Sequence, residues 1–278
     1  MVIAVASGKG GTGKTTVALS LALALGDAQF VDADAEEPNA HLFLHPAITE
    51  TIPVEMMVPE VELSQCTFCG KCAGFCQFNA LAVVNEQVLV FPEICHGCGG
   101  CVLACPAGAI RSAERQIGEV EIGTARGLQF VQGRLMPGEP SAVRIVRREL
   151  AGVTRDTTAI VDAPPGTACA VQEVIGQSDF CLLVTEPTPF GLHDLRMAMD
   201  LADELAVPYG IVINRSGASD YLIEDECLRR GVPMLLKIPF DRRIAEAYSR
   251  GACLVDALPE WRPAFERLFE DIRERAGR

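Results

Sequence analysis

The feature of this sequence that most restricts its possible folds is a glycine-rich loop at residues 8–15, Gly-Lys-Gly-Gly-Thr-Gly-Lys-Thr. The loop matches the pattern G-x-x-x-x-G-K-[ST] and lies between an expected strand at Val2–Ala6 and an expected helix at Thr16–Leu25. Glycines let backbone N–H groups and the helix N-terminus surround phosphate oxygens. The loop therefore predicts a nucleotide-phosphate site, in which Lys14 reaches the β- and γ-phosphates and Thr15 coordinates Mg²⁺.

Short apolar runs alternate with helical patterns along most of the remaining chain. This alternation is typical of a mostly parallel sheet covered by helices on both faces, so we expect an α/β fold. Strands are predicted at Gln29–Val31, Thr51–Val58, Leu128–Val131, Thr158–Val161, Phe180–Thr185, Tyr209–Ile213 and Met234–Ile238. Helices are predicted at Ser141–Leu150, Leu192–Leu205, Tyr221–Arg230, Arg242–Arg250 and Glu260–Ala276.

Eight of the twelve cysteines fall between residues 66 and 105, in two runs with the spacing C-x2-C-x2-C-x3-C. This is the spacing of bacterial ferredoxins, in which the fourth cysteine of each run ligates the other cluster. Zinc is the alternative, because paired C-x2-C is also a zinc pattern. The spacing favours two 4Fe–4S clusters, although Gln77 stands where the ferredoxin pattern has proline. One cluster is assigned to Cys66, Cys69, Cys72 and Cys105, and the other to Cys95, Cys98, Cys101 and Cys76.

The cysteine-rich segment interrupts the α/β pattern and contains the chain's one internal repeat, a duplicated half of about 30 residues. We therefore predict a small α+β ferredoxin-like domain at residues 60–115, inserted into a nucleotide-binding domain that comprises residues 1–59 and 116–278.

The formal charge of −13 makes the chain a poor partner for nucleic acid or anionic lipid. No apolar run approaches the roughly 18 residues that span a bilayer, and no export signal is evident, so we expect a cytoplasmic protein. In the C-terminal helix, acids and arginines nearly balance, which favours packing of its apolar stripe onto the domain over membrane binding.

The loop form K-G-G-T-G-K-T, with Lys9 as its early lysine, resembles the deviant Walker A motif of the MinD/ParA superfamily of P-loop ATPases. The resemblance extends over most of the chain. It implies that Lys9 reaches across a dimer interface to the partner's nucleotide. It also implies that ATP is bound by the loop residues Gly8, Lys9, Gly10, Gly11, Thr12, Gly13, Lys14, Thr15 and Thr16.

Two acidic segments resemble the switch regions of that superfamily. In Asp32-Ala-Asp34, the resemblance implies that Asp34 orients or activates the attacking water and that Asp32 supports the Mg²⁺ shell. Asp162 would hold Mg²⁺ through water, and the backbone of Gly166 would sense the γ-phosphate. The catalytic set is then Lys9, Lys14, Asp34 and Asp162, and Asn214 and Pro239 resemble the family's adenine contacts.

The whole chain thus resembles MinD-like ATPases that carry an inserted ferredoxin domain, relatives of the nitrogenase iron protein and of iron–sulfur assembly ATPases. The resemblance implies a nucleotide-gated dimer, formed with a second copy or with a paralogue, that hydrolyses ATP. The two clusters would pass electrons to a redox or metal-cofactor protein. The alternatives are an iron–sulfur or metal-cofactor carrier, and a positioning ATPase with structural or sensory clusters. Cys169 is interpreted as a small buried thiol, with a bridging cluster ligand as the alternative.

Overall fold

A computed structural model describes residues 1–277 of the chain. Its main sheet contains strands β1 (Val2–Ala6), β2 (Ala28–Asp32), β3 (Ala47–Val61), β6 (Ile110–Ala125), β7 (Leu128–Leu135), β8 (Thr158–Asp162), β9 (Phe180–Thr185), β10 (Tyr209–Ser216) and β11 (Met234–Pro239). The strand order is β11-β10-β9-β1-β8-β2-β7-β6-β3. From β11 to β7, every neighbouring pair is parallel, which confirms the predicted mostly parallel α/β sheet.

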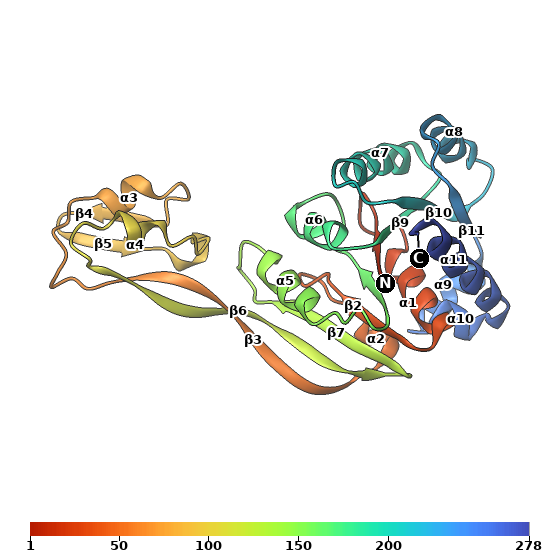
Figure 1. Cartoon of the computed structure of the whole chain (residues 1–278), viewed down its shortest axis with the longest axis horizontal. Helices are drawn as coiled ribbons and strands as arrows, with labels where there is room; N and C mark the ends of the chain where they lie inside the picture. Colours follow the sequence, from red (N-terminus) through yellow and green to blue (C-terminus); the bar gives the residue numbers. More distant parts are fainter. Residues whose placement is uncertain (278) are drawn as a thin grey trace. The chain divides into compact units, whose positions relative to one another are not determined.

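Helices connect the parallel strands, as the alternating pattern predicts (Figure 1). They are α1 (Lys14–Leu25), α2 (His41–Leu44), α5 (Val143–Ala151), α6 (Cys169–Gly176), α7 (Pro189–Glu204), α8 (Tyr221–Arg230), α9 (Arg242–Ser249), α10 (Leu254–Ala257) and α11 (Arg262–Arg275). The sequence did not predict α2, α6 or α10, because helices of four to eight residues show too few turns for a recognisable period.

One face of the sheet forms a core with α1 and α11. Buried strand residues such as Ile3, Phe30 and Phe130 lie in this core with Val17 and Leu21 of α1. In the predicted apolar stripe of the C-terminal helix, Phe265, Leu268 and Ile272 are buried in the same core, and Trp261 and Phe269 pack against it partly buried. The prediction that the C-terminal helix packs onto the domain is therefore confirmed.

The strand β6 is the largest difference from the sequence-based prediction, which placed no strand at Ile110–Ala125. The two-residue connection Arg126-Gly127 joins β6 to β7, so the two neighbouring strands form an antiparallel hairpin. Both turn residues have positive φ, 55° and 86°, as a type I′ turn requires. Charged residues along β6 hide the alternation of a half-buried strand, and Arg126 replaces the usual turn residue.

The chain divides into two compact units. The first contains residues 1–51, 120–134 and 143–278, and the second contains residues 52–119 and 135–142. The domain limits predicted from the cysteine pattern remain a prediction.

The second unit holds the short elements α3 (Lys71–Phe75), β4 (Leu81–Val84), β5 (Gln87–Val90) and α4 (Gly100–Ala104). The strands β4 and β5 form an antiparallel hairpin. A small core contains Leu81 and Ile110 together with Cys72 and Cys101. Across residues 1–277, no helix is both long and apolar enough to cross a membrane.

Candidate functional site

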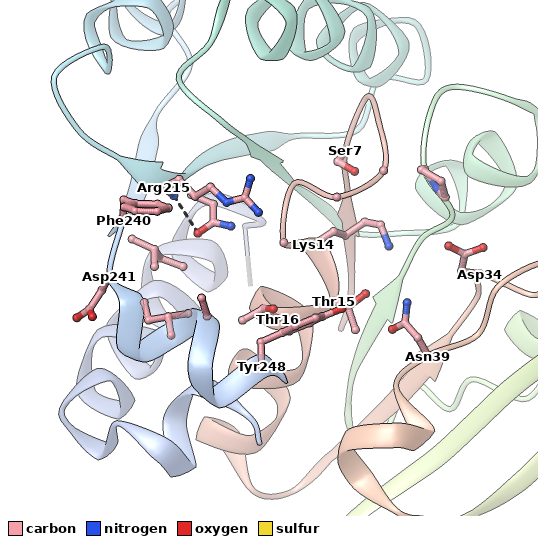
Figure 2. Close-up of a pocket in the computed structure, with 18 of the residues that line it drawn as sticks. Ser7, Lys14, Thr15, Thr16, Asp34, Asn39, Arg215, Phe240, Asp241 and Tyr248 are labelled. Carbon is pink, nitrogen blue, oxygen red and sulfur yellow. Dashed lines mark hydrogen bonds between the residues drawn. The ribbon is translucent and has the colours of Figure 1, made fainter. Parts of the chain in front are cut away.

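A cavity of about 440 Å³ lies in the first unit, beside the glycine-rich loop. It is lined by the loop with the start of α1, the segment after β2, Pro165 after β8, the end of β10, and the end of β11 with the residues that follow into α9. The cavity therefore lies at the carboxyl ends of parallel strands, where α/β sheets bind their ligands. Figure 2 shows Lys14, Thr15 and Asp34 on one side of it and Phe240 and Asp241 on the other.

The loop backbone requires glycine at two positions for steric reasons. At Gly13, φ is +90°, and a Cβ would lie 2.2 Å from Nδ2 of Asn214. At Gly8, a Cβ would lie 2.2 Å from the carbonyl oxygen of Asp194 in α7. Nδ2 of Asn214 donates to the carbonyl oxygen of Thr12 at 2.7 Å. Close packing against α7 and β10 thus determines the shape of the loop.

Lys14 and Asp162 form a buried ion pair at the base of the loop. Nζ of Lys14 lies 2.7 Å from Oδ1 of Asp162, and the two side chains are 8% and 1% exposed. The other carboxylate oxygen of Asp162 has no hydrogen-bond partner among residues 1–277. A carboxylate with a free oxygen and the hydroxyl of Thr15, which lines the cavity, are oxygen donors of the kind that Mg²⁺ prefers. These residues fit a bound Mg²⁺.

The two aspartates of the segment after β2 have different surroundings. Asp32 is fully buried, and its Oδ2 accepts hydrogen bonds from the N–H groups of Asn39 and Ala40, each at 2.9 Å. Burial and, secondarily, the charge of Asp162 raise the pKa of Asp32 to about 7. Asp34 is half-buried and lines the cavity, and burial raises its pKa to about 6. Asp34 therefore faces the cavity, whereas Asp32 holds the backbone of the segment.

The predicted nucleotide-site residues separate into two groups. Those that line the cavity are Gly10, Gly11, Gly13, Lys14, Thr15, Thr16, Asp34, Asn214 and Pro239. Those that do not are Gly8, Lys9, Thr12, Asp32, Asp162 and Gly166. Lys9 is half-buried and makes no ion pair within the described chain. The N–H of Gly166 donates to the carbonyl oxygen of Ser7 at 3.0 Å, which joins the turn after β8 to the start of the loop.

Sequence reasoning missed two prominent residues of the cavity wall, Arg215 and Tyr248. Arg215 follows Asn214 at the end of β10 and forms an ion pair with Glu186 at 2.6 Å. Tyr248 projects from the last turn of α9 (Figure 2). A tyrosine in an amphipathic helix gives no signal for ligand binding, because its pattern is equally that of ordinary packing.

In the second unit, the eight clustered cysteines surround two separate pockets. One pocket is lined by Cys66, Cys69, Cys72 and Cys105. The other is lined by Cys76, Cys95, Cys98 and Cys101. Each pocket thus takes three cysteines from one run and the last cysteine of the other run. These are the two sets that the sequence assigns to the two predicted clusters.

The two runs repeat their local geometry at an offset of 29 residues. The thiol sulfurs of Cys66 and Cys95 each accept the N–H of the second following residue, at 3.4 Å. Those of Cys76 and Cys105 each accept the N–H of the fourth following residue, at 3.3 Å. N–H groups directed at sulfur stabilise a thiolate, the form that ligates iron.

Cys169 corrects one interpretation made from the sequence. Cys169 is the first residue of α6, directly after the turn that follows β8, and its side chain is exposed. The interpretation as a small buried thiol is therefore wrong. The expectation failed because α6 was not predicted, so the position of its first residue on the surface could not be inferred.

The fold and the cavity define a P-loop nucleotide-binding protein built on a mostly parallel α/β sheet. Residues 3–255 match the model of the CobQ/CobB/MinD/ParA nucleotide binding domain, so the chain belongs to this family. Its P-loop ATPase fold supports the predicted ATPase activity. The predicted relationship to the MinD/ParA superfamily and to iron–sulfur proteins is confirmed.

Similar proteins include an uncharacterized protein of Methanocaldococcus jannaschii, MJ0579, which is 30% identical over 90% of both chains. The iron-sulfur cluster carrier protein of Pyrococcus abyssi is 25% identical over 99% of this chain and 88% of its own length. Ferredoxin-1 of Chlorobaculum tepidum matches 16% of this chain, with 35% identity over 52 residues. Among solved structures, the septum site-determining protein MinD of Pyrococcus horikoshii, complexed with Mg-ADP, superimposes with a TM-score of 0.61. It is 21% identical and covers 99% of this chain and 97% of its own.

Proposed function

We propose that this protein is an ATP-hydrolysing iron–sulfur protein, in which ATP binding and hydrolysis in a dimer gate electron transfer from two 4Fe–4S clusters to a partner protein. The observation that carries the redox part of this proposal is the sorting of eight cysteines into two sets of four, each with members of both runs. A ferredoxin-like unit within residues 60–115 is part of the proposal.

The nucleotide part of the proposal assigns roles to residues at the cavity. Lys14 and the loop N–H groups bind the β- and γ-phosphates, and Thr15 and Asp162 hold Mg²⁺, which neutralises charge on the transferring phosphoryl group. Asp34, which faces the cavity with its pKa raised to about 6, orients the attacking water while ionised. Asn214, Pro239 and the neighbouring wall bind the nucleoside.

The redox part depends on the chemistry of the donor set. Four thiols around each pocket, with N–H groups directed at two of the four sulfurs, suit a polynuclear iron–sulfur cluster. Each set of four cysteines draws on both runs, as in the ferredoxin pattern, and this distribution supports iron–sulfur clusters over the zinc alternative.

Dimer formation is proposed from Lys9, which neither lines the cavity nor forms an ion pair with any acid among residues 1–277. A second copy or a paralogue would receive its side chain. The acceptor of the electrons is a redox or metal-cofactor protein.

The second candidate function is an iron–sulfur cluster carrier. The similarity over nearly the whole chain to a protein named as such a carrier favours it. A carrier would give up iron to an apo-acceptor, whereas an electron donor would keep its iron and lose electrons. A positioning ATPase with structural or sensory clusters is the third alternative, and the burial of the α11 stripe in the core argues against its use as a membrane anchor.

The deciding experiment is anaerobic purification followed by iron and sulfide analysis and by EPR of the dithionite-reduced protein without nucleotide, with ATP and with ADP. Electron transfer predicts about eight irons per chain and a cluster spectrum or potential that shifts with ATP. Incubation with an apo-ferredoxin then separates the candidates, because only a carrier loses iron to it. Zinc in place of iron would contradict both iron-based functions.

Two matched variants test the assignment of the clusters. Cys105→Ser should remove the cluster of the first run, and Cys76→Ser the cluster of the second, so each variant should retain about four irons. The two residual EPR spectra should differ and should together reproduce the native spectrum. If each variant lost both clusters while the first unit still unfolded as in the native protein, the division of the cysteines into two independent sets would be contradicted.

A further inference from the structure

Within the described residues, one aromatic ring contact joins the wall of the nucleotide cavity to the segment after β2, and Tyr248 makes it. Its ring centroid is 5.0 Å from that of Phe43, with an angle of 45° between the planes. Tyr248 lines the cavity from α9 and is 49% exposed, whereas Phe43 in α2 is buried. The contact therefore connects an accessible cavity residue with a residue of the core.

A second contact joins the same two elements. Gly251 follows α9, with φ +69°, and a Cβ at this position would lie 3.3 Å from the carbonyl oxygen of Leu42 in α2. The end of α9 therefore packs against the backbone of α2 as well as against the Phe43 ring. Two contacts thus join the end of α9 to α2.

From α2, the connection continues to the phosphate end of the cavity. The N–H of Phe43 donates to the carbonyl oxygen of Ala40 at 3.1 Å, and the N–H of Ala40 donates to the carboxylate of Asp32 at 2.9 Å. Asp32 lies opposite Asp162 in the register of β2 and β8. Asp34, which faces the cavity, belongs to the segment between Asp32 and α2.

We propose that Tyr248 is a nucleoside-contacting positioning residue, which couples occupation of the nucleoside end of the cavity to the order of residues 33–44 through its ring contact with Phe43. This inference rests on the proposed ATP site. ATP, which fills both ends of the cavity, then orders the segment that carries Asp34 more fully than a ligand that fills only the phosphate end.

The test is hydrogen–deuterium exchange of peptides that cover residues 33–44, with saturating Mg²⁺-ATP and with saturating Mg²⁺-tripolyphosphate, which lacks the nucleoside. In the native protein, ATP should protect these amides more than tripolyphosphate does. Tyr248→Ala should lower the ATP-dependent protection to the tripolyphosphate level and weaken ATP affinity about tenfold, the scale of a lost aromatic contact. Tyr248→Phe retains the ring and should retain the protection.

Two further variants separate coupling from simple binding. Phe43→Leu keeps an apolar side chain in the core but removes the ring, so it should lose the ATP-specific protection with little loss of stability. Phe240→Ala removes a different aromatic residue of the same cavity wall, which should weaken ATP binding yet leave protection intact at saturation.

Full ATP-dependent protection in saturated Tyr248→Ala would overturn the inference and leave Tyr248 as a binding residue only. Equal protection by ATP and tripolyphosphate in the native protein would overturn it as well. Failure of the native protein to bind ATP at all would instead contradict the proposed function, so the two failures are distinguishable.

Discussion

Nζ of Lys14 donates to Oδ1 of Asp162 across 2.7 Å, and both side chains are almost completely buried. The lysine of the phosphate-binding loop and the aspartate at the end of β8 therefore form a buried ion pair, so the charge of each influences the other. Asp32 lies opposite Asp162 in the neighbouring strand, and the negative charge of Asp162 contributes to its raised pKa. A change in charge at any of these three residues affects the other two.

We expect Asp162→Asn to separate nucleotide binding from hydrolysis. The variant lacks the carboxylate proposed for Mg²⁺, so Mg²⁺-dependent turnover should fall about 100-fold or more. Lys14 loses its anionic partner and remains available to phosphate, so Mg²⁺-free nucleotide affinity should be retained or should rise. Steady-state ATPase rates and fluorescence titration with a labelled nucleotide measure the two effects. Equal loss of both would show that Asp162 serves chiefly to maintain the loop.

Lys9 should act on the nucleotide of the partner protomer. Lys9→Ala and Asp34→Ala should each lose most ATPase activity as separate homodimers. In a mixed dimer, the site with intact Asp34 receives Lys9 from the other protomer, so mixing the two inactive variants should restore a substantial part of the native rate. The ATPase rate as a function of mixing ratio measures this effect, and mixtures that remain inactive despite exchange of protomers would contradict a role in trans.

ATP hydrolysis should decline on the acidic side of neutrality. Burial raises the pKa of Asp34 to about 6, and the proposed role requires the ionised carboxylate. The ionised fraction is lost as pH falls through this value, so kcat should decrease about tenfold per pH unit below pH 6.

A control variant assigns this pH dependence. Asp32 also titrates near this range, with its pKa raised to about 7, so the pH profile of native protein alone does not identify the group. Asp34→Asn should have a low kcat, and this kcat should lack the decrease below pH 6 that is assigned to Asp34. Nucleotide affinity measured over the same pH values shows whether binding contributes. An unchanged slope in Asp34→Asn would assign the titration to another group.

Glu149 should lower the stability of the protein as pH rises above the ordinary carboxyl pKa. It is fully buried in α5, where its carboxylate lies beside the backbone of Gly133 and forms no ion pair among residues 1–277. Burial, followed by the charge of Asp32, raises its pKa well above the ordinary value. Since the folded state holds this proton more tightly than the unfolded state, the free energy of unfolding should fall as pH rises above the unfolded pKa. Glu149→Met should remove this dependence and stabilise the protein at pH 8 by about 1–3 kcal/mol.

Glu226 provides the matched control for Glu149. It is a buried carboxylate of α8, but hydrogen bonds from Arg229, Arg196 and Arg230 lower its pKa to about 2. Glu226→Gln should therefore destabilise the protein at neutral pH, with a loss of about 1.5–3 kcal/mol. Denaturant unfolding of both variants at pH 5 and pH 8 makes the comparison. A loss of stability in Glu149→Met at pH 8 would show that the buried carboxyl has a stabilising partner.

Much of the nucleotide site could be predicted from local sequence. The loop Gly8–Thr15 lies between a strand and a helix, and the acids Asp34 and Asp162 follow apolar runs, so the topology of a parallel sheet brings them to one edge. Helix boundaries were less accurate: α1 begins at Lys14 instead of Thr16, and α5 begins at Val143 instead of Ser141. The last two residues of the phosphate-binding loop, Lys14 and Thr15, therefore belong to the first turn of α1.

For the cysteine runs too, the sequence predicts one part of the site and the packing of the elements decides the other. Their spacing determined the chemistry to expect and, through the ferredoxin pattern, the exchange of the fourth cysteine between the two sets. Only the packing of α3 and α4 in the second unit brings Cys105 to Cys66 and Cys76 to Cys95. The exposed position of Cys169 depends on α6, which is too short for its periodicity to be recognised.

The sequence by itself determined the fold class, the phosphate-binding loop and the two cysteine runs, because each depends on residues close together in the chain or on a repeated alternation of strands and helices. Tertiary structure alone decided that Tyr248 contacts Phe43, that Asp32 holds the backbone before α2, and that Glu149 is fully buried. Tyr248 and Phe43 are far apart in the chain, and the surroundings of Asp32 and Glu149 are set by neighbouring elements. These relationships depend on the distances between packed elements, which local pattern and composition do not contain.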